Sequence, residues 1–355
     1  MDNIKNIIAK LDEYGVDALL LTADSSCHYS TGVGLSEGTA FITKQGCTYM
    51  TDSRYIEAAQ RDIQCAKVLM TDSRNSPNSY IAGIIAQQGI EKVGFEEDRL
   101  TYAAYNKTKE ALGVELVEAS GLLVSLRRSK NADEVEKMRA AQALTDEVFA
   151  EILGVIKEGM TEKELAAEII YRFYKKGAEG LSFDPIVVAG PNSSLPHGVP
   201  TDRKLQKGDF ITMDIGCVLG GYCSDMTRTV ALGYADDEMK KVYETVLAAQ
   251  KAGISAAKAG MTGHDIDKAA RDVIVAAGYG EYFGHSFGHS LGLEVHEAPN
   301  ASPINKEPMP VGAVISAEPG IYLPGRFGVR IEDVIILGEN GCEDITKSPK
   351  ELIIV

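Results

Sequence analysis

Two short segments of this chain place carboxylates inside stretches that otherwise have the character of buried β-strands. Residues 211–230 contain Asp214 and Asp225, and β-branched and apolar residues flank Leu219-Gly220, a pattern typical of a hairpin. A two-residue loop at Leu219-Gly220 predicts that Asp214 and Asp225 lie directly opposite each other, with Cβ atoms about 4.5–5.5 Å apart. Two carboxylates at that distance repel each other unless a proton or a cation lies between them.

A second hairpin, at residues 315–334, repeats the arrangement. A turn at residues 324–326 predicts that Glu318 and Glu332 also face each other across the two strands. A single acidic pair in a hairpin is usually a solvated surface feature. Two pairs in strands with buried character favour a metal site instead, because a buried carboxylate without a partner is costly.

Length, charge and cysteine content narrow the class of protein. A chain of 355 residues favours two domains over one. The net charge of −15 argues against nucleic acid and against anionic membrane surfaces as partners. We expect neither a secretory signal nor a membrane span, because no apolar run is long enough. The six cysteines are scattered without C-x-x-C spacing, which indicates reduced thiols in a cytoplasmic protein.

The order of the expected elements predicts two domains, residues 1–122 and 123–355. The first alternates helix and strand, which is typical of an α/β domain with a mixed sheet. In the second, the order helix, helix, hairpin occurs twice, which indicates an α+β domain with an internal pseudo-duplication and a site where its two halves meet. Capping-box patterns at Asn131 and Thr161 predict the starts of two helices. The glycines of residues 32–38 do not match the dinucleotide fingerprint, since a hairpin follows them, and we interpret them as turn residues.

Most of the histidines lie beside the two acidic hairpins. One precedes the first hairpin in a loop of turn residues, and three lie in the glycine-rich segment 284–297 that precedes the second. The zinc-protease motif H-E-x-x-H is not met at residues 296–300, because position 300 is asparagine and Pro299 disfavours a helix. The four histidines near the hairpins are His197, His285, His289 and His296.

The combined pattern resembles the site of the Xaa-Pro peptidases, a group that includes aminopeptidase P and prolidase, within the wider family of methionine aminopeptidase and creatinase. The N-terminal segments Tyr29-Ser-Thr-Gly32 and Thr51-Asp-Ser-Arg54-Tyr55 are similar to that family too. The resemblance covers nearly the whole chain and implies a "pita-bread" C-terminal domain with pseudo-twofold duplication. The residues that carry it are Asp214, Asp225, His289, Glu318 and Glu332, with His197 before them and His296 seven residues after His289.

The resemblance also implies two divalent metal ions. Asp225 and Glu332 would bridge both ions, Asp214 would bind one, and His289 and Glu318 would bind the other. Bridging carboxylates dilute the repulsion between two cations, and such paired ions activate water in aminopeptidases. Four carboxylates and one imidazole form an oxygen-rich ligand set, so we expect Mn2+, with Co2+, Fe2+ and Zn2+ as alternatives.

Catalytic roles follow from the same resemblance. Glu318 would carry the proton from the attacking water to the leaving proline nitrogen. His296 and His197 would stabilise the oxyanion and hold the substrate carbonyl. Arg330, two residues before Glu332 on the same strand face, would orient the acidic ligands. Asp214 would also help to place the free amino group of the substrate.

The expected activity is hydrolysis of the Xaa-Pro bond at the N-terminus of peptides, as in aminopeptidase P. The alternative is a prolidase, which cleaves Xaa-Pro dipeptides and generally has an arginine where this chain has Asn300. A second alternative is a catalytically silent homologue that binds other proteins, but such proteins usually lack ligands that are all present here. The expected partner is a proline-containing peptide, and the resemblance alone suggests a homodimer.

Overall fold

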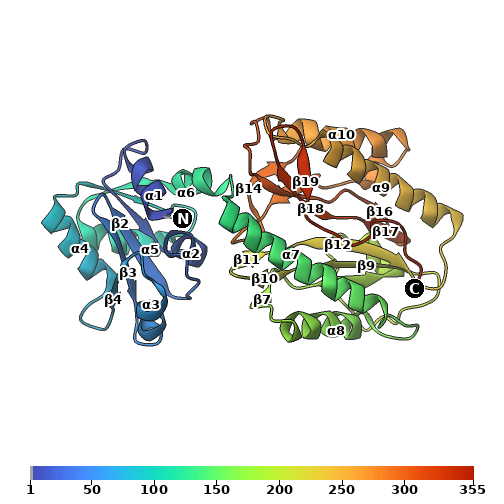
Figure 1. The fold of residues 1–355 in the computed structure, drawn as a ribbon, viewed down its shortest axis with the longest axis horizontal. Coiled ribbons are helices and arrows are strands. Elements are labelled where there is room, and N and C mark those ends of the chain that lie inside the picture. The colour runs from blue at the N-terminus through green and yellow to red at the C-terminus, as the bar shows by residue number, and fades with distance from the viewer. Residues whose placement is uncertain (1–2) are drawn as a thin grey trace. The chain divides into compact units, whose positions relative to one another are not determined.

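The computed structural model describes residues 3–355 and divides the chain into two compact units, Met1–Arg127 and Arg128–Val355 (Figure 1). The boundary predicted after residue 122 falls inside helix α6 (Ser120–Arg127), which belongs to the first unit. The first unit is an α/β unit with a mixed sheet and the second is an α+β unit, so the predicted fold class is confirmed.

A mixed sheet of six strands, in the order β4-β3-β2-β1-β5-β6, forms the centre of the first unit. The β1–β2 and β2–β3 pairs are antiparallel, whereas β1–β5, β3–β4 and β5–β6 are parallel. The central strand β1 is buried along its whole length, as its run of alanine and leucine predicts. The strands are β1 (Ala18–Leu21), β2 (Gly38–Thr43), β3 (Gly46–Thr51), β4 (Lys67–Met70), β5 (Lys92–Phe95) and β6 (Glu115–Glu118).

Helices connect these strands and bury their apolar faces against the sheet. Ile81 and Ile85 of α4 pack with Leu20 and Phe41 of the sheet in one hydrophobic core. Gly32 is the C-cap of α2 in the left-handed conformation, as a turn residue would be, whereas Gly38 is the first residue of β2 and pairs with Thr51. Besides α6, the helices are α1 (Asn3–Leu11), α2 (Asp24–Thr31), α3 (Ile56–Asp62), α4 (Pro77–Gln88) and α5 (Tyr102–Leu112).

Two helix pairs form the helical part of the second unit. Figure 1 shows the pair α7–α8 and the pair α9–α10 on different sides of the strands. Both predicted capping boxes are present, with the side chains of Asn131 and Thr161 accepting from the third helical N–H. The helices are α7 (Ala132–Leu153), α8 (Glu162–Lys175), α9 (Asp237–Ala256) and α10 (Gly263–Ala276), with short turns η1 (Gly190–Ser194) and η2 (Gly280–Tyr282).

Antiparallel strands follow each helix pair, which gives the two halves of the unit the same order of elements. In the first half the sheets are β12-β9-β8 and β11-β10-β7, and in the second they are β14-β13-β15-β18-β19 and β16-β17. The strands are β7 (Gly180–Leu181), β8 (Ile186–Ala189), β9 (Phe210–Ile215), β10 (Cys217–Leu219), β11 (Tyr222–Cys223), β12 (Met226–Ala231), β13 (Gly288–Ser290), β14 (Glu297–Ala301), β15 (Val314–Ala317), β16 (Gly320–Leu323), β17 (Phe327–Arg330), β18 (Asp333–Leu337) and β19 (Cys342–Asp344).

The register predicted for the first acidic hairpin is wrong by two residues. Leu219 pairs with Tyr222, so the loop is Gly220-Gly221, and both glycines have positive φ (58° and 77°). A two-residue loop of this kind needs positive φ at both positions, which a Gly-Gly pair adopts readily. Asp214 is therefore opposite Thr227 and diagonal to Asp225. A shift by two keeps both carboxylates on one face, because side chains alternate with a period of two.

The register predicted for the second acidic hairpin is confirmed. Leu323 pairs with Phe327 across the three-residue turn, and Gly320 pairs with Arg330. On the far side, Ala317 pairs with Asp333 in the same register. Glu318 and Glu332 therefore face each other at the junction between the β16–β17 and β15–β18 pairings.

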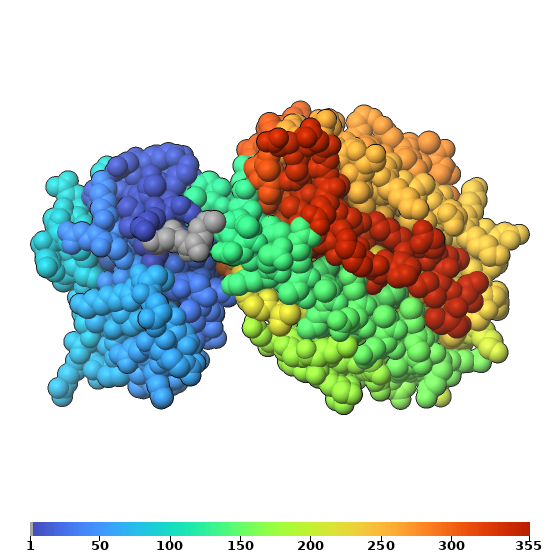
Figure 2. Space-filling view, viewed as in Figure 1, coloured from blue at the N-terminus to red at the C-terminus, as the bar shows by residue number. Residues whose placement is uncertain are grey.

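The C-terminal segment lies against the strands that carry these carboxylates. The fully buried guanidinium of Arg228 donates to the carbonyl oxygens of Ser348 (2.8 Å) and Pro349 (2.9 Å) and forms an ion pair with Asp333 (2.6 Å). Figure 2 shows residues near the C-terminus, in red, along the surface of the second unit. Within residues 3–355, none of the helices combines the length and apolar character that a bilayer crossing requires.

Candidate metal centre and active site

All the predicted site residues line one cavity of about 560 Å³ in the second unit. Apolar side chains, among them Phe183, Ile186, Val199 and Val295, form part of its wall. The polar part of the wall consists of carboxylates, histidines, a tyrosine, an arginine, a serine and an asparagine. The predicted residues that line it are His197, Asp214, Asp225, His289, His296, Glu318, Arg330 and Glu332.

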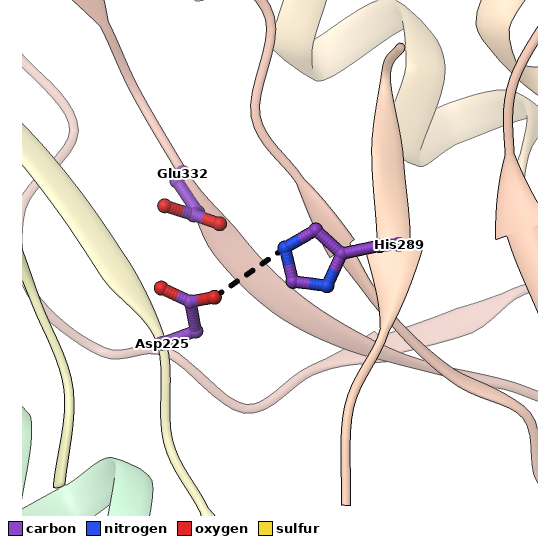
Figure 3. Close-up of side chains that lie close together, drawn as sticks. All are labelled: Asp225, His289 and Glu332. Atoms are coloured by element: carbon purple, nitrogen blue, oxygen red, sulfur yellow. Dashed lines mark ion pairs between the residues drawn. The ribbon is translucent and has the colours of Figure 1, made fainter. Parts of the chain in front are cut away.

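Three of the predicted metal ligands in this wall lie close to one another. One donor atom each from Asp225, His289 and Glu332 lies within 4.8 Å of the other two, a spacing suited to a shared cation. Figure 3 shows the two carboxylates and the imidazole pointing toward one another from three different strands or loops. His289 Nε2 is 3.6 Å from Asp225 Oδ2 (Figure 3).

Glu318 joins this cluster through His289. Its Oε1 is 3.3 Å from His289 Nε2 and accepts a hydrogen bond from Ser316 Oγ (2.9 Å). The same Ser316 hydroxyl accepts from the backbone N–H of His289 (3.0 Å). One hydroxyl on β15 therefore fixes the orientation of two candidate ligands.

Asp214 also lines the cavity, with one carboxylate oxygen hydrogen-bonded and the other without a hydrogen-bond partner. Arg330 Nη2 donates to Asp214 Oδ2 over 2.6 Å, and both side chains are mostly buried. Among the described residues, Asp214 Oδ1 is one of few buried side-chain atoms without a hydrogen-bond partner. A buried, unpaired carboxylate oxygen is costly unless something binds it, which marks this atom as an available ligand.

Arg330 connects several residues of the site by hydrogen bonds, in line with its predicted position on the face of Glu332. Its Nε donates to Thr227 Oγ1 (2.9 Å), and that hydroxyl donates to Glu332 Oε2 (2.6 Å). Its Nη1 donates to Tyr322 OH (2.9 Å) and to the carbonyl oxygen of Pro196 (3.2 Å). All three nitrogens of the guanidinium group therefore donate hydrogen bonds to protein atoms.

The two histidines with predicted catalytic roles lie on different parts of the cavity wall. His296 contacts His289 edge to face, with ring centroids 4.3 Å apart. His197 follows η1 and lies in the exposed loop at the cavity. Burial lowers the pKa of His296, and the neighbouring His289 lowers it further, so the neutral ring is favoured.

The acidic cluster is electrostatically unfavourable as a group of free carboxylates. Burial raises the pKa of Asp225 well above its usual range, and the charges of Glu332 and Asp214 raise it further. Burial and the neighbouring carboxylates of Glu318 and Asp214 raise the pKa of Glu332 in the same way. Burial lowers the pKa of His289, which keeps its imidazole neutral and able to act as a ligand.

These observations fit divalent cations. Four carboxylates with like charge converge, one of their oxygens lacks a hydrogen-bond partner, and a neutral imidazole stands beside them. The donors are oxygens with a single nitrogen, which suits hard or borderline divalent metals. The arrangement can hold such ions next to a cavity that has room for a small peptide.

Several functional residues were not assigned a role from the sequence alone. Tyr322 lines the cavity, and Thr227 is buried and bonds Glu332 and Arg330. The two residues are four and two positions from Glu318 and Asp225, and this alternation could have identified them. His285 Nε2 is hydrogen-bonded to Tyr322 OH (2.9 Å). The sequence feature that pointed to His285 was its place in the glycine-rich segment, four residues before His289. Ser316 carried no signal in the sequence.

Fold and site together define a two-domain metallopeptidase of the pita-bread type. The model of metallopeptidase family M24 matches residues 136–339, and that of the creatinase/prolidase N-terminal domain matches residues 3–129. The chain belongs to metallopeptidase family M24, which confirms the resemblance found in the sequence. A curated relative, the Xaa-Pro dipeptidase of Pyrococcus horikoshii, is 34% identical over 354 residues, covering 99% of each protein.

Solved structures give the same result. An Xaa-Pro dipeptidase from Bacillus anthracis is 41% identical, with a TM-score of 0.96 over 100% of this chain and 99% of that one. An X-Pro aminopeptidase from Thermotoga maritima is 37% identical, with a TM-score of 0.92 over 97% of this chain and 99% of that one. The fold is thus shared along the full length of this chain.

Proposed function

We propose that this chain is a metal-dependent Xaa-Pro peptidase whose preferred substrates are Xaa-Pro dipeptides. The observation that carries the proposal is the convergence of Asp225, His289 and Glu332 within 4.8 Å, beside a cavity with an apolar wall. Similarity over nearly all of the chain to proteins named Xaa-Pro dipeptidase supports it. The sequence interpretation placed aminopeptidase P first and prolidase second, and these relatives favour the reverse order.

Five residues would hold two divalent cations, with Mn2+ as the proposed metal. Asp225 and Glu332 would hold both ions, as the family resemblance implies, and one carboxylate oxygen of each lies within 4.8 Å of the other and of a His289 nitrogen. Asp214 would bind one ion through its unpaired Oδ1, while Arg330 holds its other oxygen. His289 and Glu318, which are 3.3 Å apart, would bind the other. When bound, such a pair of ions supplies an activated water at neutral pH.

The remaining roles belong to side chains at the cavity wall. Glu318 takes up the proton of the attacking water and passes it to the proline nitrogen that leaves. His296 donates to the oxygen that becomes negatively charged during attack, and His197 holds the substrate carbonyl. Arg330 positions the acidic ligands through Asp214 and Thr227.

Longer Xaa-Pro peptides are the second candidate substrate, and a specific feature favours them. Among the residues of the described chain that line the cavity, Arg330 is the single lysine or arginine, and its donors are engaged. Asn300 lies at the cavity and offers only a neutral amide to a dipeptide carboxylate. In a longer peptide the group after proline is an uncharged amide, which the neutral side chain of Asn300 would bind better than it would bind a carboxylate.

We also propose that the protein acts in the cytoplasm and forms a homodimer. Scattered thiols without disulfides, including the buried Cys27 and Cys217, are consistent with a reducing compartment. The dimer rests on the family resemblance alone.

A peptide panel tests the proposed activity. Xaa-Pro dipeptides and matched Xaa-Pro-Yaa tripeptides are incubated with the protein, with and without Mn2+, and products are followed by mass spectrometry. We expect Mn2+-dependent cleavage with a higher kcat/KM for dipeptides. A higher value for tripeptides would favour the aminopeptidase, and cleavage of neither class would contradict the proposal.

A further inference from the structure

A buried ion pair lies next to His289 and His296 in the β13–β14 pairing. Lys130 Nζ is 3.1 Å from Glu297 Oε2, and only 2% and 5% of the two side chains are exposed. Neither residue lines the cavity among residues 3–355, so neither contacts a substrate there. Removing two charges from water costs free energy that their attraction often does not recover. A role in positioning other residues therefore explains this buried pair better than a gain in stability does.

The ammonium group joins two strands at an irregular point in their pairing. His289 pairs with Asn300, but the next residue, Ser290, pairs with Glu297, so the register shifts between His289 and Ser290. Lys130 Nζ donates to Ser290 Oγ (3.0 Å) as well as to Glu297. It therefore binds both strands directly after the irregularity that sets the direction of His289.

The carboxylate of Glu297 also fixes the loop that leads to His296. Its Oε1 accepts from the backbone N–H of Glu294 over 3.1 Å. A Cβ at Gly292 would lie 2.9 Å from both carboxylate oxygens, so any side chain at this position would displace the Glu297 carboxylate. The carbonyl of Gly292 in turn accepts from the N–H of Cys223 (2.7 Å), two residues before Asp225.

His296, which directly precedes β14, lines the cavity, whereas Glu297, the first residue of the strand, forms the ion pair with Lys130. The contact between the His289 and His296 rings, at 4.3 Å, then depends on the β13–β14 arrangement that Lys130 and Glu297 hold. A displacement of this hairpin would move a candidate metal ligand and a candidate oxyanion donor together.

We propose that Lys130 and Glu297 are positioning residues that set the places of His289 and His296. This inference rests on the proposed function of those two histidines. Lys130 begins the segment before α7, and its own N–H donates to the carbonyl of Gly312 (2.9 Å), so its backbone is fixed independently of the pair. The side chain can therefore act as a rigid support for the hairpin.

The test compares Lys130→Met, which removes the charge but keeps the length, with the wild-type protein. We expect roughly 10–100-fold weaker Mn2+ binding by calorimetry, the loss typical when a support of a metal ligand is removed. At saturating Mn2+, kcat for an Xaa-Pro substrate should fall by about 10–100-fold with KM changed less than about threefold. The matched control is Arg203→Met, which breaks another mostly buried ion pair, with Asp209 (2.7 Å), and should lower Tm while leaving both quantities unchanged.

A second variant keeps the test decisive if Lys130→Met does not fold. Glu297→Gln keeps the shape and should weaken Mn2+ binding in the same direction. The double variant should be no worse than Lys130→Met, because the two residues act as one unit. Lowered Tm with wild-type Mn2+ affinity and wild-type kcat would overturn the inference. Mn2+ binding is measured without a peptide, so absent cleavage by the wild-type protein would contradict the proposed function and leave this test intact.

Discussion

Glu318 and Glu332 face each other at the junction of two antiparallel pairings that share one register. Each glutamate is held by a hydroxyl: Ser316 donates to Glu318, and Thr227 donates to Glu332. Two carboxylates held in buried facing positions repel each other, so their arrangement is stable only with a counter-charge. The first predictions concern that counter-charge.

Replacement of Glu332 by glutamine should remove most of the activity. The variant keeps the size of the side chain and an acceptor for Thr227 but loses one bridging charge. We expect kcat to fall by about 10³-fold or more, since groups that act as a unit fail together. Glu339→Gln, an exposed glutamate beyond β18, is the matched control and should keep wild-type kinetics. Equal turnover by the two variants would refute the bridging role.

His296→Ala should separate catalysis from metal binding. Loss of one oxyanion donor typically costs about 10²–10³-fold in kcat, and we expect that loss here. Metal content, measured by elemental analysis, should match the wild type, because His296 contacts the ligand His289 through its ring and is not itself a proposed ligand. A variant that loses its metal would show that ligand and catalytic group were assigned the wrong way round.

The metal-free protein should become less stable as pH rises. Burial and neighbouring charges raise the carboxyl pKa values of Asp225 and Glu332, so the folded state binds these protons more tightly than the unfolded state. Their stabilising contribution is complete below the ordinary carboxyl pKa of about 4 and is lost as pH rises through the raised values.

Thermal unfolding with a chelator checks this sign. Glu332→Gln carries no such charge, so its unfolding temperature should be nearest to that of the wild type at about pH 4 and should exceed it at about pH 8. Saturating Mn2+ should reverse the order at pH 8, because the wild type then gains a bound cation. A metal-free wild type that is the more stable of the two at pH 8 would refute the explanation.

Asn300→Arg should shift the substrate preference toward dipeptides. A guanidinium near the leaving proline can form a bidentate pair with the free carboxylate of a dipeptide, and Arg330 cannot serve because it binds Asp214. We expect the ratio of kcat/KM for Xaa-Pro over Xaa-Pro-Yaa to rise by about tenfold. Asn300→Gln, a neutral amide, is the control and should leave the ratio unchanged. An unchanged ratio in the arginine variant would place the carboxylate away from Asn300.

The register of the second acidic hairpin was predicted correctly, whereas that of the first was not. At residues 324–326 a single proline- and glycine-containing turn fits the flanking strands, and the register followed. At the first hairpin two adjacent glycines permit more than one loop, and positive φ at both of them selected Gly220-Gly221. The two aspartates were still assigned correctly to one face of the hairpin, because the register was wrong by an even number of residues.

Contacts between distant segments were beyond sequence reasoning. Lys130 and Glu297 are far apart in the chain, and a lysine before a helix is ordinarily a solvated residue. The same holds for Arg228, whose buried bonds to Ser348 and Pro349 depend on where the C-terminal segment lies. Local periodicity identifies which face a residue takes, but only the packed fold identifies its partner.

Metal stoichiometry measured together with turnover tests the central claim most directly. Metal-free protein is titrated with Mn2+, bound ions per chain are counted by elemental analysis, and Xaa-Pro cleavage is followed at each step. The account predicts that the wild type binds two ions per chain and that cleavage rises with their binding, whereas Asp225→Asn binds fewer and does not cleave. Full cleavage by protein with less than one ion per chain would contradict it.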